Sequence, residues 1–513
     1  MFYPPVLSSK ATILHRKIKR VMRNVFVIIC GLAILISGCV ADQSSKEQLP
    51  NVILVMADDL GYGDIACYGN DVVATPALDQ LATEGVKFQQ FYAAAPVCSP
   101  TRGSCLTGRH PFRYGIPWAG DGFLPEGEVT IAEALKIKNY RTGHFGKWHV
   151  GELSKTVNQS YFAGDVDPNH YSPPWENGFD ECFSTESMMP TYNPYYHVGG
   201  DYGTEGYLHI QNKEIKRGQR NDGFQWRDLY WTGPGQFVDE WLEGDDSKII
   251  MDRALNFIGD CHSNEDHFLS VIWFHTPHTP VVAGNEDRKT YSALSMEEQH
   301  WYGAISAMDK QVGRLMTYLK EKGLDENTIV WFCSDNGPSY IHNLNSSGGL
   351  RGKKATLYEG GLRVPAMLYW PRKLEKAVVS DLPVSTSDIY PTVLDACGIE
   401  VEHQPILDGK SILSQLQNKT TRRSDYLFFQ SPLPARLKKS ETTNEEQYAV
   451  IDGEFKLISV DNGATYQLYN IKTDKAEQKD ISYLYLDRVG KMRKALEDWR
   501  VSCKNSAAGN DYQ

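Results

Sequence analysis

Basic residues are too few in this sequence for a protein whose main partner is nucleic acid. The 513 residues include 53 lysines and arginines against 64 aspartates and glutamates, which gives a formal net charge of -11 at pH 7. Nucleic-acid binding depends on a basic face that neutralises phosphates, so the composition excludes nucleic acid as the principal partner. A small anionic substrate remains compatible with it, because such a ligand needs only a local positive pocket.

Internal repeats and strongly biased composition are also lacking. Hydrophobic residues make up 41% and charged residues 23% of the chain, with 43 glycines and 25 prolines. This composition is globular and excludes a wholly disordered, collagen-like or coiled-coil protein. No period of about 20 to 50 residues recurs, which excludes solenoids and propellers.

Closely spaced cysteines are absent as well. The 10 cysteines are far apart and irregular, so they form neither a disulfide framework nor a Cys-x-x-Cys metal pair. Cys333 and Cys397 lie in apolar patterns, and we expect them to be small buried hydrophobic residues.

The N-terminus lacks an apolar run long enough to span a membrane. The run from Val25 to Ser37 has 13 residues, whereas a spanning helix needs roughly 20. Basic residues precede it and small residues follow it, which is typical of a secretion signal. The stretch Leu35-Ile36-Ser37-Gly38-Cys39 resembles the cleavage box of bacterial lipoproteins, in which the cysteine becomes the lipidated first residue. We predict a lipoprotein signal peptide at 1–38, a lipidated Cys39 and a polar tether at 39–50, hence an exported, lipid-anchored protein of the periplasm or cell surface; a plain membrane anchor is the alternative.

Apolar segments alternate with amphipathic ones from residue 51 onwards. Apolar runs bounded by turns predict strands, and the capping boxes at Thr130–Glu133 and Ser295–Glu298 predict helix starts. Such alternation is typical of an α/β fold, a parallel sheet with helices on both faces. The predicted strands are 51–57, 86–94, 140–146, 267–274, 328–334 and 364–370, and the predicted helices are 75–84, from 130 onwards, 248–260, 295–322 and 387–396.

The pattern changes after about residue 405. Short strands are predicted at 426–430, 447–451, 454–460 and 466–469, joined by turns such as Asp452-Gly453 and followed by a helix at 485–501. We expect a small antiparallel sheet covered by one helix. The predicted domains are therefore a large one at 51–405 and a C-terminal subdomain at 406–513.

Polar residues directly follow several of the predicted strands of the large domain. Parallel sheets bind ligands at the carboxyl ends of their strands, so we expect these side chains to meet there. Carboxylate and amide oxygens suit a hard divalent cation, and carboxylates clustered without one would raise one another's pKa. Helix caps and turns explain any one of these residues but not all of them together. They are Asp58, Asp59, His275, His278, Asp335 and Asn336, of which His275 is expected to be structural or to contact the edge of a substrate.

The most specific motif is Cys98-Ser99-Pro100-Thr101-Arg102, continued by Leu106-Thr107-Gly108. It resembles the Cys-x-Pro-x-Arg signature of formylglycine-dependent sulfatases, the type I sulfatases of the alkaline phosphatase superfamily. The resemblance covers nearly all of the chain beyond Asn51, except that 152–246 has no residue-by-residue match. Further segments that recur in family order are 58–64, 146–149, 278–280, 335–337, 354–361, 451–457 and 468–470.

The resemblance implies a sulfuric ester hydrolase with a large mixed, mostly parallel sheet sandwiched by helices. In this family a maturation enzyme, either formylglycine-generating or anaerobic, oxidises the cysteine to an aldehyde, which makes position 98 the nucleophile. One hydroxyl of the hydrated aldehyde attacks sulfur, and loss of a proton from the other then releases sulfate, a step that a plain Cys or Ser lacks. The family's ion is usually calcium, and its implied ligands here are Asp58, Asp59, Cys98, Asp335 and Asn336.

The other catalytic roles also come from the resemblance. Arg102 is expected to hold an oxygen of the hydrated aldehyde, while Lys147 binds it together with the sulfate. His149 takes the proton in the release step. His278 and Lys354 are expected to contact the sulfate and the leaving oxygen, one of them donating a proton. Since Lys147 and His149 are two residues apart, both face the site only if the strand ends there.

The long segment from Glu152 to Asp246 is rich in aromatic residues, which either bind sugar rings or fill the core of long loops. For an exported protein we expect a sulfated polysaccharide substrate, for example an algal one, or its oligosaccharides. One alternative is a phosphomonoester, phosphodiester or phosphonate hydrolase of the same superfamily, and another is an inactive glycan-binding lipoprotein. The aromatic residues are Trp175, Tyr192, Tyr195, Tyr196, His197, Trp226, Tyr230, Trp231 and Trp241.

Overall fold

The computed structural model describes residue 1 and residues 49–157, 167–194, 229–238, 242–339, 345–433 and 446–512. Cys39 and five residues of the aromatic segment, Tyr195, Tyr196, His197, Trp226 and Trp241, lie outside these ranges. The chain from Pro50 onwards forms one compact unit. Within the described ranges, none of the helices has the length and apolar character needed to cross a membrane.

A mixed sheet of ten strands forms the centre of this unit. The strands are β1 (Asn51–Ala57), β2 (Val86–Phe88), β4 (Arg141–Lys147), β5 (Glu181–Thr185), β6 (Trp231–Gly233), β7 (Gln236–Phe237), β8 (Phe268–Trp273), β9 (Thr328–Ser334), β10 (Ala366–Tyr369) and β11 (Val378–Ser380). Their order is β11-β2-β10-β9-β1-β8-β4-β5-β6-β7. The middle strands β9, β1, β8, β4 and β5 are parallel, whereas β10 and β6 join them antiparallel. The expected mixed, mostly parallel sheet is confirmed.

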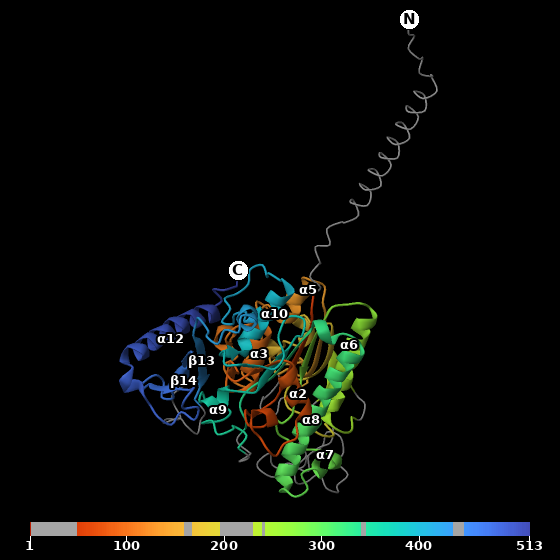
Figure 1. Ribbon diagram of the computed structural model, residues 1–513, viewed down its shortest axis with the longest axis horizontal. Coiled ribbons are helices and arrows are strands. Elements are labelled where there is room, and N and C mark those ends of the chain that lie inside the picture. The colour runs from red at the N-terminus through yellow and green to blue at the C-terminus, as the bar shows by residue number, and fades with distance from the viewer. Residues whose placement is uncertain are drawn as a thin grey trace. The chain divides into compact units, whose positions relative to one another are not determined.

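Helices cover both faces of this sheet (Figure 1). On one face, α2 (Pro76–Glu84), α6 (Asp246–Ser263) and α8 (Met296–Glu321) share the main hydrophobic core with Ile53 and Val55 of β1. On the other, α3 (Cys98–Thr107), α5 (Ile131–Lys136) and α10 (Ile389–Cys397) pack together. Both predicted capping boxes form, at Thr130 and Ser295. The remaining short helices are α4 (Pro111–Tyr114), α7 (Asn285–Lys289), α9 (Glu359–Leu362) and α11 (Leu413–Gln417).

The strand predicted at 86–94 is wrong in one respect, because it is two separate strands. β2 ends at Phe88, and β3 (Phe91–Tyr92) pairs instead with β12 (Val384–Ser385) in a small sheet of its own. Between them, the backbone of Gln89 donates to the carbonyl of Ser380. Pairing with a distant segment, rather than the local pattern, sets this break.

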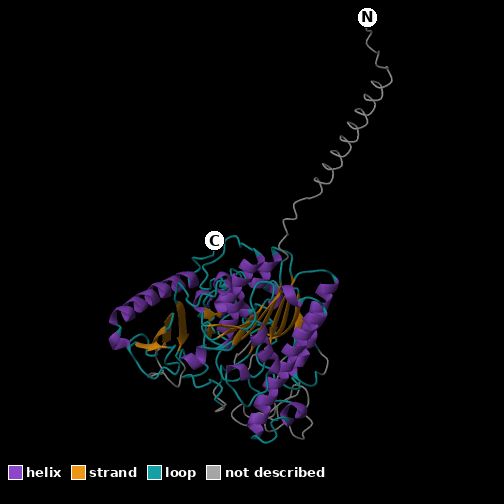
Figure 2. Cartoon of the chain, in the orientation of Figure 1, coloured by secondary structure: helices purple, strands orange, loops and turns teal. Residues whose placement is uncertain are grey.

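The C-terminal part is a four-stranded antiparallel sheet with one long helix, as expected (Figure 2). Its elements are β13 (Leu427–Pro432), β14 (Glu446–Asp452), β15 (Phe455–Ser459), β16 (Gln467–Asn470) and α12 (Leu486–Ala507). Alternate residues point to opposite faces of the sheet. Val450 packs with Leu496 of α12, whereas Ile451 packs with Leu357 of the large domain. The boundary at 405/406 stays a prediction.

Candidate active site

The site lies at the carboxyl edge of the central parallel strands. β1 pairs with β9 on one side and with β8 on the other, and β4 is the next strand along. Asp58 and Asp59 follow β1 directly, Asp335 and Asn336 follow β9, and Lys147 is the last residue of β4. The topology therefore brings together residues that are hundreds of positions apart in the chain.

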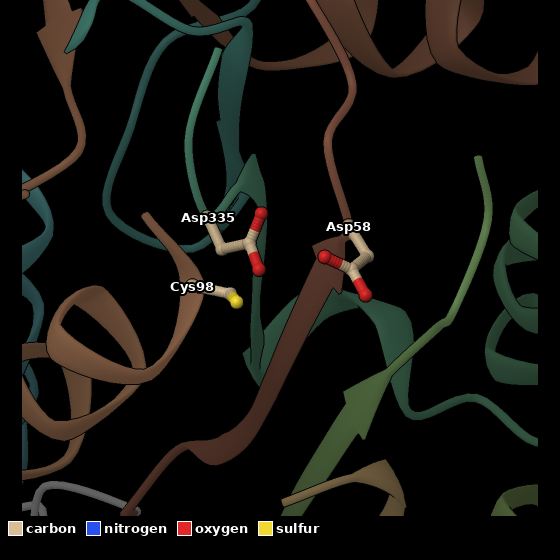
Figure 3. A group of neighbouring side chains, drawn as sticks. All are labelled: Asp58, Cys98 and Asp335. Atoms are coloured by element: carbon tan, nitrogen blue, oxygen red, sulfur yellow. The ribbon is translucent and has the colours of Figure 1, made fainter. Parts of the chain in front are cut away.

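Cys98 opens helix α3 and faces the two acidic strand ends. Figure 3 shows its sulfur turned toward the carboxylates of Asp58 and Asp335. The potential ligand atoms of these three residues lie within 4.8 Å of one another. Burial raises the pKa of the Cys98 thiol, so the unmodified side chain stays protonated at neutral pH and is a poor nucleophile.

Two fully buried cations neutralise these carboxylates. Lys147 Nζ donates to Asp58 Oδ2 at 2.7 Å. Arg102 Nη2 donates to Asp335 Oδ2 at 2.7 Å and lies 3.6 Å from Asp58 Oδ1. Burial alone would raise the pKa of Asp58, but the charges of Lys147 and Arg102 hold it well below its usual value. Burial and the charge of Asp58 raise the pKa of Asp335 to about 7.

A second group of polar side chains surrounds Asp59. Asn336 Nδ2 donates to Asp59 Oδ1 at 2.7 Å, and Lys354 Nζ donates to the same oxygen at 2.5 Å. His278 Nε2 lies 3.7 Å from Asp59 Oδ2. The lysine that reaches the site is therefore Lys354, as the resemblance implies. Burial lowers the pKa of His278 to about 4, so this imidazole is neutral at neutral pH.

The chemistry of these donors fits a hard divalent cation. Asp58 Oδ1, Asp59 Oδ2 and Asn336 Oδ1 are buried and accept no hydrogen bond from any residue that the structure describes. Buried oxygens are normally satisfied, so orphaned ones at one place require a partner such as an ion. The ligand atoms of Asp58, Asp59 and His278 also lie within 4.8 Å of one another. Carboxylate and amide oxygens of this kind are the ligands that calcium takes in proteins.

The end of β4 explains how Lys147 and His149 face the same site. Gly146 has φ +105°, and a Cβ there would lie 1.9 Å from the carbonyl oxygen of Trp273, so only glycine fits. Lys147 is the last strand residue, and His149 has φ +60°, which turns the chain back. The predicted strand break is thus present. Burial, with the charge of Lys147, holds the pKa of His149 well below its usual value, so the imidazole is neutral at neutral pH.

His275 lies outside this cluster. Its Nδ1 is 2.8 Å from Asp246 Oδ2, and its Nε2 is 2.7 Å from Thr185 Oγ1. Both ring nitrogens are therefore engaged by the scaffold. Of the two roles expected for His275, the structure supports the structural one.

The described aromatic residues of the segment from Glu152 to Asp246 are of two kinds, buried and partly exposed. Tyr230 is 0% and Trp231 is 2% exposed, and Tyr230 stacks on Phe183 and donates to Asp246, so both fill the core. Trp175 and Tyr192 remain partly exposed and are the described candidates for contact with a sugar.

Sequence reasoning missed two residues at the carboxyl ends of strands that lie on either side of β4. Glu186 directly follows β5 and is buried, where it accepts a hydrogen bond from the backbone of Leu153 at 3.1 Å. Burial raises the pKa of Glu186 to about 8. The sequence predicted no strand at 181–185, so the strand-end signal that revealed Asp58 was not available for Glu186. The Cζ atom of the Arg102 guanidinium lies over the ring of Trp273, 5.2 Å from the ring centroid. No local sequence signal predicts this contact.

Known proteins resemble this chain over most of its length. The profile of the family "Sulfatase" matches residues 50–399, and that of "N-sulphoglucosamine sulphohydrolase, C-terminal" matches 351–501. Arylsulfatase D of Homo sapiens is 30% identical over 462 residues, 79% of this chain and 75% of that protein. Steryl-sulfatase of Homo sapiens is 30% identical over 436 residues, 75% of this chain and 72% of that protein.

Solved structures show the same fold. The crystal structure of Ps i-CgsB superposes with a TM-score of 0.71 at 26% identity, covering 91% of this chain and 94% of that chain. With a family profile over 50–399 and these relatives, this chain belongs to the sulfatase family: it is a type I sulfatase of the alkaline phosphatase superfamily, a sulfuric ester hydrolase.

Proposed function

We propose that this enzyme removes sulfate from a sulfated carbohydrate, using formylglycine made from Cys98 and one calcium ion. The observation that carries the proposal is the buried cluster in which Cys98, three acids and three cations converge. Its substrate class is supported by Ps i-CgsB, which is 26% identical and has been solved in complex with k-i-k-neocarrahexaose. A sulfated polysaccharide, for example an algal one, or its oligosaccharides would suit the partly exposed Trp175 and Tyr192.

The side chains at this site fit both a calcium ion and a formylglycine at position 98. Asp58, Asp59, Asp335, Asn336 and residue 98 would hold the calcium ion. Bound there, calcium would neutralise the sulfate and polarise its sulfur, while formylglycine would supply a hydrated aldehyde as nucleophile. Burial raises the pKa of the unmodified Cys98 thiol and so disfavours its thiolate, which supports a partner that matures it, a formylglycine-generating or anaerobic sulfatase-maturating enzyme.

Burial divides the cationic residues into two roles. Arg102 and Lys147 are 0% exposed and hold the acids in place. The side chains of Lys354 and His278 are 18% and 12% exposed, so they face an incoming sulfate group. The charge of Asp59 keeps the pKa of Lys354 above its usual value despite burial, so this lysine carries a proton before the substrate binds. We assign Lys354 and His278 to the sulfate and leaving oxygen, and His149 to the proton transfer that releases product.

Paired esters of one alcohol test this function. We expect kcat/KM for 4-nitrophenyl sulfate to exceed that for 4-nitrophenyl phosphate by at least about tenfold, or about 1.4 kcal/mol in transition-state stabilisation. The comparison matters because a phosphonate monoester hydrolase shares the fold, with a TM-score of 0.61 at 18% identity. A preference for phosphate would establish that alternative, and release of neither product by the matured enzyme would favour an inactive glycan-binding lipoprotein.

The location of the enzyme is a separate proposal. We propose that residues 1–38 are removed during export and that lipid on Cys39 anchors the protein through the tether at 39–50, at the periplasmic or outer surface of a membrane. When the protein is produced in the native host and partitioned between a detergent phase and an aqueous phase, Cys39→Ser should move it from the detergent phase to the aqueous phase. Metabolic labelling with a fatty-acid analogue should mark the wild type alone. Equal labelling of the variant would contradict a lipidated Cys39.

A further inference from the structure

We infer that the C-terminal sheet positions Lys354 for catalysis, and that Gln447 of β14 is the residue through which it does so. The inference rests on the proposed role of Lys354 at the sulfate. Gln447 touches no reacting group and is a positioning residue.

The amide of Gln447 holds the backbone just after Lys354. It is 0% exposed. Its Nε2 donates to the carbonyl of Ala355 at 3.0 Å, and its Oε1 accepts from the backbone N–H of Leu357 at 3.1 Å. The same Nε2 lies 3.2 Å from the carbonyl of Pro432 in β13. One side chain of the small sheet thus binds the backbone of the loop after Lys354 on both sides of Thr356.

The loop after Lys354 needs such support because Ala355 adopts a left-handed conformation. Its φ is +73°, which is unfavourable for a residue with a Cβ and persists only when the surroundings hold it. Both of its backbone groups are bonded: the C=O to Gln447, and the N–H to the carbonyl of Pro96 at 2.8 Å. Pro96 lies two residues before Cys98. The loop is therefore tied to the C-terminal sheet and to the nucleophile segment through a single residue.

A second contact fixes the end of the same loop. Lys456 of β15 lies 3.0 Å from Glu359 Oε1 and 3.0 Å from Glu477 Oε1, and all three side chains are 0% exposed. Glu477 Oε2 also accepts from the backbone N–H of Glu359 at 2.7 Å. Because this buried ion group and the core around Leu357 keep the loop docked, loss of Gln447 alone should loosen Lys354 without undocking the small sheet.

Lys354 is sensitive to such loosening. Its Nζ reaches Asp59 Oδ1 at 2.5 Å from the end of a long side chain, so its position depends on where its backbone lies. Its own N–H donates to the carbonyl of Pro338 at 2.9 Å, two residues after Asn336. A displacement of about 1 Å in a positioning group costs up to about 100-fold in rate.

Gln447→Leu in the matured full-length enzyme tests the inference, with Gln430→Leu as the matched control. Leucine keeps most of the volume but removes both hydrogen bonds. Gln430 lies on the neighbouring strand β13 and is 6% exposed, but its amide donates to the Glu446 side chain at 2.8 Å instead. We expect Gln447→Leu to lower kcat/KM for 4-nitrophenyl sulfate about 10- to 100-fold. We expect Gln430→Leu to change it less than about twofold.

A double-mutant cycle separates positioning from a structural effect. If Gln447 acts through Lys354, adding Gln447→Leu to Lys354→Ala should cost little further activity. A full additional loss would overturn the inference and leave the role of Lys354 intact. A Lys354→Ala enzyme of normal activity would overturn the proposed role of Lys354 and the inference with it.

Hydrogen exchange provides a second measurement that needs no turnover. The Ala355 amide is bonded to Pro96 rather than to Gln447, so faster exchange of this amide reports movement of the loop itself. We expect faster exchange at Ala355 in Gln447→Leu and not in Gln430→Leu, with α12 protected in both. Unchanged exchange at Ala355, or lost protection throughout the C-terminal sheet, would contradict a specific positioning role.

Discussion

Cys98→Ala in the matured enzyme is expected to lower sulfate-ester turnover by at least about 1,000-fold, the scale seen when a nucleophile is removed. The sulfur lies beside Asp58 and Asp335 at the start of α3. Turnover of 4-nitrophenyl sulfate and the thermal melting temperature should be measured together. Activity should be lost while the fold remains.

Cys105→Ala is the matched control for this variant. Cys105 lies in the same helix and is 0% exposed. It belongs to neither of the potential ligand groups found among the described residues. Its loss should cost some stability from the small cavity and little activity. Comparable activity of Cys98→Ala and Cys105→Ala would contradict the role of position 98.

Asp335→Ala is expected to abolish calcium binding and turnover together. Asp335 accepts from Arg102 at 2.7 Å and from the backbone N–H of Asp59 at 3.0 Å, so it organises the site as well as offering an oxygen to the ion. Its removal also leaves the buried Arg102 guanidinium without its closest partner. We expect calcium affinity to fall by at least about 100-fold, measured by isothermal titration calorimetry on metal-depleted enzyme.

Asp309→Asn is the control for removal of a buried acid. Asp309 is 1% exposed and caps α2 through the backbone N–H groups of Ala77 and Leu78. This variant should be less stable but should bind calcium and turn over substrate normally. Full activity of the wild-type enzyme in an excess of chelator would refute the metal assignment, whatever the variants do.

Local signals in the sequence predicted much of the fold. β1 and β9 have the predicted bounds, and α2 begins one residue later than predicted, because a short apolar run or a helix between a proline and a glycine is encoded by consecutive residues. The two capping boxes formed for the same reason. The division of 86–94 into β2 and β3 depends instead on a partner strand nearly 300 residues away, which no local pattern contains.

The candidate site shows the same limit. The strand-end rule and the family motif named the acids, Lys147, His278 and Lys354, and the structure brings them into one cluster. Their catalytic roles stay proposals. What sequence reasoning missed is what holds these residues: Trp273 beneath Arg102, and Gln447 around Ala355. Such contacts join distant elements through ordinary residue types, so they become visible only when the chain is folded.

The mass of the peptide that contains residue 98 tests the central claim most directly. The enzyme should be produced with and without a co-expressed maturation enzyme, and the same samples should be assayed for sulfate release. We predict that the active sample carries an aldehyde in place of the thiol and that activity rises in proportion to the modified fraction. Full activity in a sample whose Cys98 is an unmodified thiol would contradict the account.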